Sequence, residues 1–496
     1  MPPSIATAVC AAGILGLFWL DRDQRLRTSG ALWIPIIWLS IACSRTIGQW
    51  LELGTPIDPT YQVLEGSPID RLVFTVLLGV ASIVLVGRSK QLGRLLQANG
   101  PIILFLCYCA FTLLWSDYPG VAFKRWIKAV GDLAMILIVL SDREPRAAFE
   151  RLLARLSYVL IPLSILFFKY YPQLGMGWSE WTGTPIYTGV TNNKNTLGAV
   201  CLLLGLGTLW RFLAAYKEKE AAGRTQRMVA RAVILAMVLR LFWLADAKTA
   251  LVSFLMASFL LLAANSRAVI RTPAIMHLLI VFLLAVTIAV VFLGINPDML
   301  KAIGRNPTLT ERTGLWADLL RLVRNPFFGT GFESFWLGPR LTELWRLYPW
   351  RPNEAHDGYL EIFLNLGWAG VALLAVVLAT GYRTVFTAWN RRLPLGDLRL
   401  AYFFVGLVFN FTEAAFFKIV APVWLFFLFA IIRTPEVPRS ETQPSAQDLL
   451  RHTSPPICEH ALSTDRGNFR GWLANVPARA SKRLEKLPDR PARNRG

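Results

Sequence analysis

Long apolar segments alternate with short polar segments along most of the chain. About thirteen of the apolar segments approach the roughly 20 residues that an α-helix needs to cross a bilayer. An open strand would leave its backbone polar groups unpaired in lipid, so each segment is predicted to be a helix. The predicted spans are 4–20, 31–44, 72–87, 101–115, 126–140, 156–168, 196–213, 229–245, 249–264, 274–294, 359–380, 400–412 and 420–432. This pattern predicts an all-α, polytopic integral membrane protein.

The polar and basic segment 295–358 interrupts the pattern and separates two long apolar segments. It ends in the run from Asn353 to Tyr359, which contains His356. The other three of the 4 histidines lie in an apolar run or in a Pro- and Ser-rich tail. Titratable groups that gather at a membrane face are the first candidates for chemistry in such a chain. We therefore expect the active site in this loop.

Composition agrees with the pattern. The chain is 54% hydrophobic, with 18 Trp and 30 Phe, and its mean hydropathy is +0.44. The net charge of +20 comes mainly from short inter-helix loops and the tail, as the positive-inside rule predicts, so a nucleic-acid partner is not expected. The 6 cysteines show no paired spacing, and we expect neither a disulfide nor a metal site.

The basic loops also predict orientation. Clusters of Lys and Arg occupy alternate loops, at 22–27, 88–94, 143–155, 217–231, 267–271 and 383–399. These loops are predicted to be cytoplasmic, which places the 295–358 loop on the periplasmic face. The opposite face nevertheless carries cations, and cations on the disfavoured side are candidates for function. They are Lys124, Arg125, Lys128, Lys194, Lys248 and several arginines near His356.

Two units are expected along the chain. Residues 1–433 form the membrane domain, with the large periplasmic loop at 295–358. From Thr434 the composition changes to Pro, Ser and Arg with few apolar residues, which cannot bury enough surface to offset the entropy of folding. Residues 434–496 are therefore predicted to be a disordered, basic cytoplasmic tail. Its last basic cluster is either solvated or in contact with anionic lipid headgroups.

Two short polar links on the outer face are candidate anion sites. The turn from Thr188 to Gly198 leads into an apolar helix, which Thr191 or an Asn is expected to cap. The free amides of that helix and Lys194 would favour an anion, unless the lysine only snorkels beside an ordinary cap. Lys248 lies in a very short link, where it either serves an anionic substrate or pairs with Asp246.

The large loop offers two more candidates. Segment 308–316 is predicted to be a capped amphipathic helix on the membrane surface. It carries Arg312, which either presents its guanidinium fork to a phosphate or forms a surface ion pair with a glutamate. The Pro and Gly residues of 325–332 demand tight turns that fold the loop back toward the bilayer.

His356 is either a catalytic base or a polar surface residue. A neutral imidazole with an unperturbed pKa of about 6.5 is suited to accept a hydroxyl proton. Glu354 and Asp357 are near enough in sequence to orient it.

The combination and order of these motifs resemble the O-antigen ligase and polysaccharide polymerase superfamily, most closely its exopolysaccharide-production branch. The resemblance covers roughly 115–432 and rests on NNKNTLG, AKTALV, TLTERTGLWADLL, NPFFGTGFESFW, NEAHDGYLEIFLNLGWAGV and FNFTEA. It implies an all-helical membrane glycosyltransferase that uses a polyprenyl-diphosphate-linked glycan as donor and needs no metal or other cofactor. Two departures are visible. Asn193 stands where the family usually has a histidine, and Asp357 follows the histidine in place of Asn.

Carried over by position, the resemblance implies that His356 and Arg312 are catalytic and that Lys194 and Lys248 bind substrate. We expect Asn195 and Glu413 to join the substrate-binding set, with Glu413 pairing a cation, steadying the imidazole, or forming only a structural ion pair.

The predicted function is a polymerase of the bacterial inner membrane that joins lipid-linked repeat units into exopolysaccharide at the periplasmic face. Its expected partners are the donor and acceptor glycans and membrane lipids, with a flippase and a chain-length regulator as further candidates. One alternative is a ligase that moves finished glycan onto a lipid A core or a protein. The other is a transporter, although the chain lacks the paired broken segments and internal symmetry typical of transporters.

Overall fold

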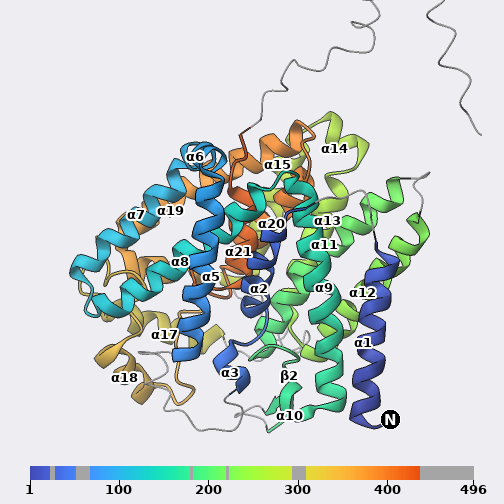
Figure 1. Cartoon of the computed structure of the whole chain (residues 1–496). Helices are drawn as coiled ribbons and strands as arrows, with labels where there is room; N and C mark the ends of the chain where they lie inside the picture. The colour runs from blue at the N-terminus through green and yellow to red at the C-terminus, as the bar shows by residue number, and fades with distance from the viewer. Residues whose placement is uncertain (23–27, 52–66, 179–182, 219–222, 293–308, 436–496) are drawn as a thin grey trace, which may run out of the picture. The chain divides into compact units, whose positions relative to one another are not determined.

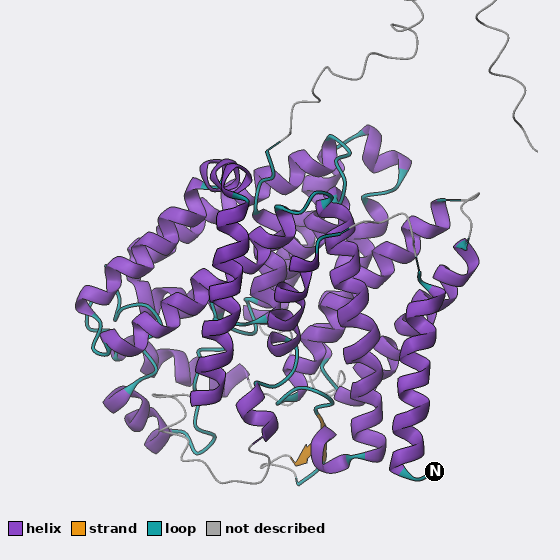
Figure 2. Ribbon diagram, in the orientation of Figure 1, coloured by secondary structure: helices purple, strands orange, loops and turns teal. Residues whose placement is uncertain are grey.

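The computed structural model describes residues 1–22, 28–51, 67–178, 183–218, 223–292 and 309–435. The predicted tail and the start of the predicted periplasmic loop lie outside these residues. Helices account for nearly all of the regular structure, and one short antiparallel strand pair stands beside them (Figure 2). The helices are α1 (Pro3–Leu20), α2 (Trp33–Ala42), α3 (Ile47–Leu51), α5 (Pro68–Gly87), α6 (Ser89–Ala98), α7 (Gly100–Phe111), α8 (Pro119–Leu140), α9 (Pro145–Tyr170), α10 (Pro172–Gly175), α11 (Lys194–Lys217), α12 (Arg224–Ala245), α13 (Lys248–Ala263), α14 (Arg267–Arg271), α15 (Ala274–Phe292), α17 (Leu309–Arg321), α18 (Gly338–Leu347), α19 (Gly358–Asn390), α20 (Gly396–Phe409) and α21 (Pro422–Ile431); the 3₁₀ turns are η1 (Gly30–Leu32) and η2 (Thr112–Trp115), and the strands are β1 (Met176–Trp178) and β2 (Pro185–Tyr187).

The predicted all-α membrane architecture is confirmed. Six helices of the described residues are long and apolar enough to cross a membrane, or up to seven if the α6–α7 pair, bent by 88°, is counted as one span. Every one of the predicted apolar segments overlaps a helix. Several of these helices are shorter than a full span, so the number of crossings stays a prediction.

The connections sort to two ends of the helical unit Met1–Pro435. Figure 1 shows α6 and α14, which belong to two of the basic connections, at the upper end. Helices α3, α10, α17 and α18 lie at the lower end. These two basic connections therefore lie at the end opposite to α3, α10, α17 and α18. We expect the lower end to face the periplasm.

Close helix contacts at the lower end depend on small residues. A Cβ on Gly198 of α11 would meet Ala247 and Ala250 at the start of α13 at 2.5 and 3.0 Å. Small residues let helix backbones approach closely, which favours packing where lipid offers no hydrophobic driving force. This contact places the beginning of α11, with Lys194, beside the beginning of α13, with Lys248.

The described part of the large loop has a small core of its own. It is formed by Leu315, Leu319, Phe335, Trp336, Leu341, Leu344, Ala355 and Leu364. The apolar face of α17 belongs to it, since Leu315 and Leu319 are 0% exposed. Part of the apolar face that was expected on the membrane surface therefore packs against α18 and the start of α19, whereas Leu320 of the same face is 50% exposed. The loop is a packed cap that ends at His356.

The turns of 325–331 hold this cap against a break in α19. The backbone of Gly367 has φ 64 and ψ −166, which interrupts the helix. The freed groups are paired by the loop: Trp368 N donates to Pro326 O at 2.9 Å, and Gly331 N donates to Asn365 O at 2.9 Å. Gly329 has φ 70, and a Cβ there would clash with the backbone of Asn365. The Pro and Gly residues thus return the loop to the helices, as their turn chemistry predicts.

Candidate active site

The backbone around His356 is anchored at the start of α19. Asp357 caps this helix, since its Oδ1 accepts from Tyr359 N at 2.9 Å and from Leu360 N at 2.8 Å. The next residue, Gly358, donates its N–H to Asn410 O at 2.8 Å, and a Cβ on Gly358 would clash with the Asn410 side chain. Asp357 is therefore a helix cap and not the group that orients the imidazole, which corrects the expectation from sequence.

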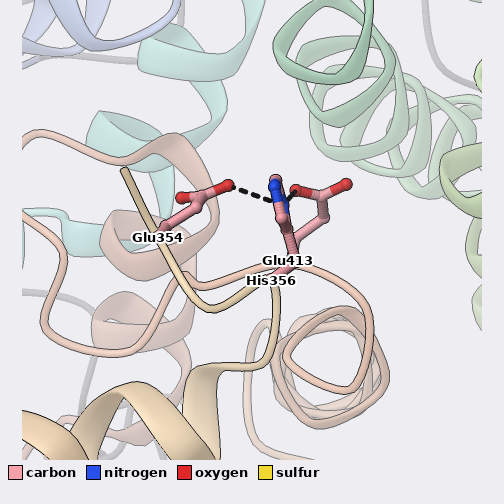
Figure 3. A group of neighbouring side chains, drawn as sticks. All are labelled: Glu354, His356 and Glu413. Atoms are coloured by element: carbon pink, nitrogen blue, oxygen red, sulfur yellow. Dashed lines mark hydrogen bonds and ion pairs between the residues drawn. The ribbon is translucent and has the colours of Figure 1, made fainter. Parts of the chain in front are cut away.

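The imidazole of His356 lies between two carboxylates (Figure 3). Its Nδ1 is 3.0 Å from Glu354 Oε1 and 3.4 Å from Glu413 Oε2. The backbone of His356 is left-handed, with φ 51, a conformation that costs a non-glycine residue about 1–3 kcal/mol and is common at functional sites. Both carboxylates contact Nδ1, so Nε2 is the ring nitrogen directed away from them.

A lysine balances the charge of this cluster. Lys418 Nζ pairs with Glu354 Oε2. The segment that carries Lys418 is fixed by Phe417, which stacks on Phe105 with ring centroids 3.6 Å apart. Two carboxylates therefore face one lysine and one imidazole.

The surroundings change the protonation of His356. Burial by itself would lower its pKa, but the hydrogen bonds and charges of Glu354 and Glu413 outweigh burial and raise the pKa from 6.5 to about 9. For Glu354, burial would raise the pKa, yet Lys418 and His356 hold it well below its usual range. The expected neutral imidazole with an unperturbed pKa is therefore wrong. At neutral pH the ring carries a proton, and the cluster has no net charge.

The turn before α11 joins the cluster through Glu413. Asn195 Nδ2 donates to Glu413 Oε1 at 2.9 Å. Asn193 caps the helix by accepting from Thr196 N at 2.8 Å, which is one of the two caps expected from sequence. Lys194 follows the cap, and within the described residues it has no hydrogen-bond or ion-pair partner. Its ammonium and the first amides of α11 are therefore available to an anion.

The Arg312 side chain extends from α17 to the turn that carries Glu413. Lys248 lies at the start of α13. Arg312 Nη1 donates to Thr412 O at 3.0 Å, next to Glu413, and the guanidinium interacts electrostatically with Asp357. Lys248 Nζ is 3.8 Å from Asp246 Oδ1, and both side chains are partly exposed. The structure thus gathers His356, Glu413, Asn195 and Arg312 in one place, whereas Lys248 has the alternative pairing expected from sequence.

Two basic residues of this region were not singled out from sequence. Lys418 is described above. Arg45 is buried, and its Nε and Nη2 donate to Thr191 O at 3.1 and 3.0 Å, while Nη2 also donates to Leu174 O at 2.6 Å. Arg45 therefore fixes the turn that presents Lys194 and Asn195. Both residues are cations beside predicted spans on the outer face, so the same charge argument would have found them.

Asn410 was missed for a different reason. It is buried, and its Oδ1 accepts from the backbone N–H groups of Ala415 and Phe416 at 2.8 Å each. It thereby shapes the turn that carries Glu413, while its carbonyl holds Gly358. An Asn within an apolar helix end gives no local sign of these distant contacts.

The ligand atoms of Glu354, His356 and Glu413 lie within 4.8 Å of one another, close enough to hold a metal ion. A divalent cation there would have to displace the Lys418 ammonium from Glu354 and the proton from His356. Because the charges already balance, this donor set suits proton transfer better than metal binding. Metal independence stays a prediction.

Comparisons with known proteins agree with these motifs. Residues 227–375 match the sequence profile of the O-antigen ligase family, a stretch that contains Lys248, Arg312 and His356. The chain is also 25% identical over 311 residues to the exopolysaccharide production protein ExoQ of Rhizobium meliloti (strain 1021), which covers 60% of this chain and 68% of that protein. The resemblance seen in the sequence is confirmed: these parts of the chain are similar to the O-antigen ligase and polysaccharide polymerase superfamily.

Proposed function

We propose that this protein joins polyprenyl-diphosphate-linked oligosaccharide repeat units into an exopolysaccharide at the periplasmic face of the bacterial inner membrane. The family supports a lipid-linked glycan as substrate, and the similarity to an exopolysaccharide production protein supports this kind of product. The observation that carries the proposal is the cluster of His356, Glu413, Asn195 and Arg312 beside the start of α11.

The donor diphosphate would be held by cations at the lower end of the helices. Arg312, Lys194 and Lys248 supply positive charge there, and the first amides of α11 add their dipoles. As the bond between the anomeric carbon and the diphosphate oxygen breaks, negative charge develops on the leaving lipid diphosphate. Fixed cations stabilise that developing charge more than the ground state, which lowers the barrier.

His356 would take the proton of the acceptor hydroxyl as its oxygen forms the new bond to the anomeric carbon. A carboxylate behind Nδ1 fixes the ring and stabilises the imidazolium that forms, as in other carboxylate–histidine pairs. Because the pKa is raised to about 9, the neutral base is a minor species at pH 7 but a strong one. The resting imidazolium would meanwhile attract the incoming diphosphate.

Purified protein and lipid-linked repeat units test the proposal. We expect a ladder of polymer that lengthens by one repeat unit at a time, together with release of one lipid diphosphate for each bond formed. Transfer to a lipid A core or a protein, with no ladder, would favour the ligase. Transport without covalent product would contradict both. Addition of a chelator would test metal independence, and neighbouring genes for a flippase and a chain-length regulator would favour the polymerase.

A further inference from the structure

The peptide groups on either side of Ala355 lie immediately before His356 and are shielded from solvent. Ala355 is 0% exposed and belongs to the small core of the large loop. Its N–H and C=O groups therefore cannot bond to water, and each needs a partner within the protein. The two partners come from different helices.

Glu361, in the first turn of α19, binds the N–H group of Ala355. Its Oε2 accepts from Ala355 N at 3.0 Å. Its Oε1 accepts from Trp336 Nε1 at 2.6 Å and from Asn365 Nδ2 at 2.9 Å. Three donors thus converge on one side chain and use both of its oxygens. A carboxylate can accept on both atoms, whereas an amide can accept on only one.

Glu361 is itself held in place by the large loop. Trp336, which donates to it, is buried in the loop core. Asn365, one turn further along α19, accepts through Oδ1 from Ser334 N at 3.0 Å and from Phe335 N at 3.1 Å. The carboxylate of Glu361 therefore has a fixed position relative to both the loop and α19.

Trp316 of α17 binds the C=O group of Ala355. Its Nε1 donates to Ala355 O at 2.8 Å. Arg312, one turn earlier on the same helix, donates to Thr412 O, next to Glu413. Residues four apart lie on one face of a helix. Helix α17 therefore contacts both backbone segments that meet in the histidine cluster.

These contacts fix the backbone where the chain enters the left-handed conformation of His356, with φ 51. Ala355 O belongs to the peptide group that precedes His356, so the Trp316 bond acts directly on the orientation of the histidine. A non-glycine residue keeps such a conformation only where its surroundings impose it. Without these contacts the backbone could relax and turn the ring away from its carboxylates.

We propose that Glu361 and Trp316 are positioning residues for His356. They fix the peptide groups on either side of Ala355, so that the imidazole stays between its two carboxylates (Figure 3). This proposal rests on the proposed function, because it assigns both residues to the reaction of the histidine. Both act through the backbone.

Glu361→Gln and Trp316→Phe remove the two bonds separately. The two donors at Oε1 are expected to hold the single amide oxygen of glutamine, so its NH₂ group would face Ala355 N and that bond is lost. Phenylalanine keeps an aromatic ring in place of Trp316 but has no N–H to donate. Trp345→Phe is the matched control, because Trp345 Nε1 donates at 3.0 Å to Pro352 O, a carbonyl of the same loop.

The pKa of His356, measured by NMR on isotope-labelled histidine, reports the position of the ring without any substrate. In native protein the two carboxylates raise this pKa to about 9. It should fall toward about 6.5 in Glu361→Gln and in Trp316→Phe. In both variants kcat should fall roughly 10- to 100-fold while KM changes less than about threefold, because a displaced base slows the chemical step more than binding. Trp345→Phe should keep the native pKa and kcat, even where it lowers the melting temperature.

A native pKa in both folded variants, or an equal fall in Trp345→Phe, would overturn the proposal. A fall in Glu361→Gln while folded Trp316→Phe keeps the native value would also overturn it, because the loss of charge would then be the cause. If Glu361→Gln does not fold, the comparison of Trp316→Phe with Trp345→Phe decides. If native protein makes no polymer while the pKa values follow the expected pattern, the proposed reaction fails and the positioning stands. If native protein makes polymer and the pKa is unchanged in both variants, only the positioning role is wrong.

Discussion

Replacement of Glu413 by Gln should move the pH dependence of the reaction to lower pH. Glu413 Oε2 lies 3.4 Å from His356 Nδ1, and its carboxylate helps to raise the histidine pKa to about 9. Gln keeps the shape of the side chain and its hydrogen-bonding capacity toward Asn195, but it removes the negative charge. The neutral imidazole therefore becomes easier to form.

The size of the change follows from the distance and the exposure. Two unit charges about 4 Å apart interact by about 1 kcal/mol in water and about 4 kcal/mol near a protein surface. His356 and Glu413 retain 22% and 14% side-chain exposure, so we take a value toward the lower limit, about 1.4 kcal/mol. This corresponds to a pKa about 1 lower. The neutral fraction of His356 at pH 7 would rise roughly tenfold, and a somewhat weaker base would offset part of that gain.

Single-turnover rates from pH 6 to 10 would reveal the shift. In native protein the rate should rise with pH and level off near the His356 pKa, because only the neutral ring accepts a proton. In Glu413→Gln it should level off at lower pH and at a lower plateau, so that the two profiles cross. Isotope-labelled histidine gives an independent measurement by NMR, since the chain has only 4 histidines.

Lys418→Met is the matched variant of opposite sign. Without the lysine, the Glu354 charge acts on His356 alone, so the histidine pKa should rise and the profile should move to higher pH. The raised pKa of His356 also makes the stability of the fold depend on pH. The raised pKa means that imidazolium pairing stabilises the fold below about pH 6.5 and is lost as pH rises through about 9. Unchanged profiles in both variants, or an alkaline shift in Glu413→Gln, would refute the role of this cluster in proton transfer.

Four further predictions test other parts of the site. His356→Ala should lower the single-turnover rate roughly 10²–10⁴-fold, and near-normal turnover by folded protein would remove the histidine from the mechanism. Arg312→Ala should weaken both donor binding and turnover, with little rescue by Arg312→Lys, because a point charge cannot reproduce the guanidinium fork; full rescue would argue against a forked contact. Arg45→Lys should lower the free energy of unfolding by about 1–3 kcal/mol through carbonyls left unpaired, measured by thermal unfolding, and unchanged stability would contradict its anchoring role. A reporter fused after Arg340 should be periplasmic and one after Arg391 cytoplasmic, and finding both on one side would overturn the predicted orientation.

The helical architecture was predictable because lipid allows few alternatives. An apolar segment near span length must be a helix when its backbone groups cannot bond to water, so the predicted segments all overlap helices. Breaks within these helices were harder to predict from the sequence. The break at Gly367 lies within NLGWAG, where two glycines among mostly apolar residues are compatible with a straight helix. The loop backbone of 326–331 pairs with the freed groups, and the Tyr108 hydroxyl donates to Leu366 O at 2.9 Å, so partners distant in sequence make the break stable.

The candidate site was predictable as a set of residues but not as a set of contacts. Asn195 and Glu413 are 218 positions apart, and their meeting depends on how α11 and the turn after α20 pack. The face of α17 shows the same limit. Its apolar residues have the spacing of a surface helix, and nothing local distinguishes lipid from the protein core that covers part of that face.

The protonation of His356 shows why local sequence misjudges chemistry. Glu354 lies two residues away, but Glu413 and Lys418 arrive from another turn, which Asn410 and Phe417 hold in place. Three positions in and around the cluster, Glu333, His356 and Phe417, have left-handed backbones with φ 54, 51 and 55. Each costs about 1–3 kcal/mol, and packing against the helices must offset that cost. They are three of the eight non-glycine residues with positive φ in the described part of the chain, and they show that the packing around the imidazole maintains its geometry at the expense of local stability.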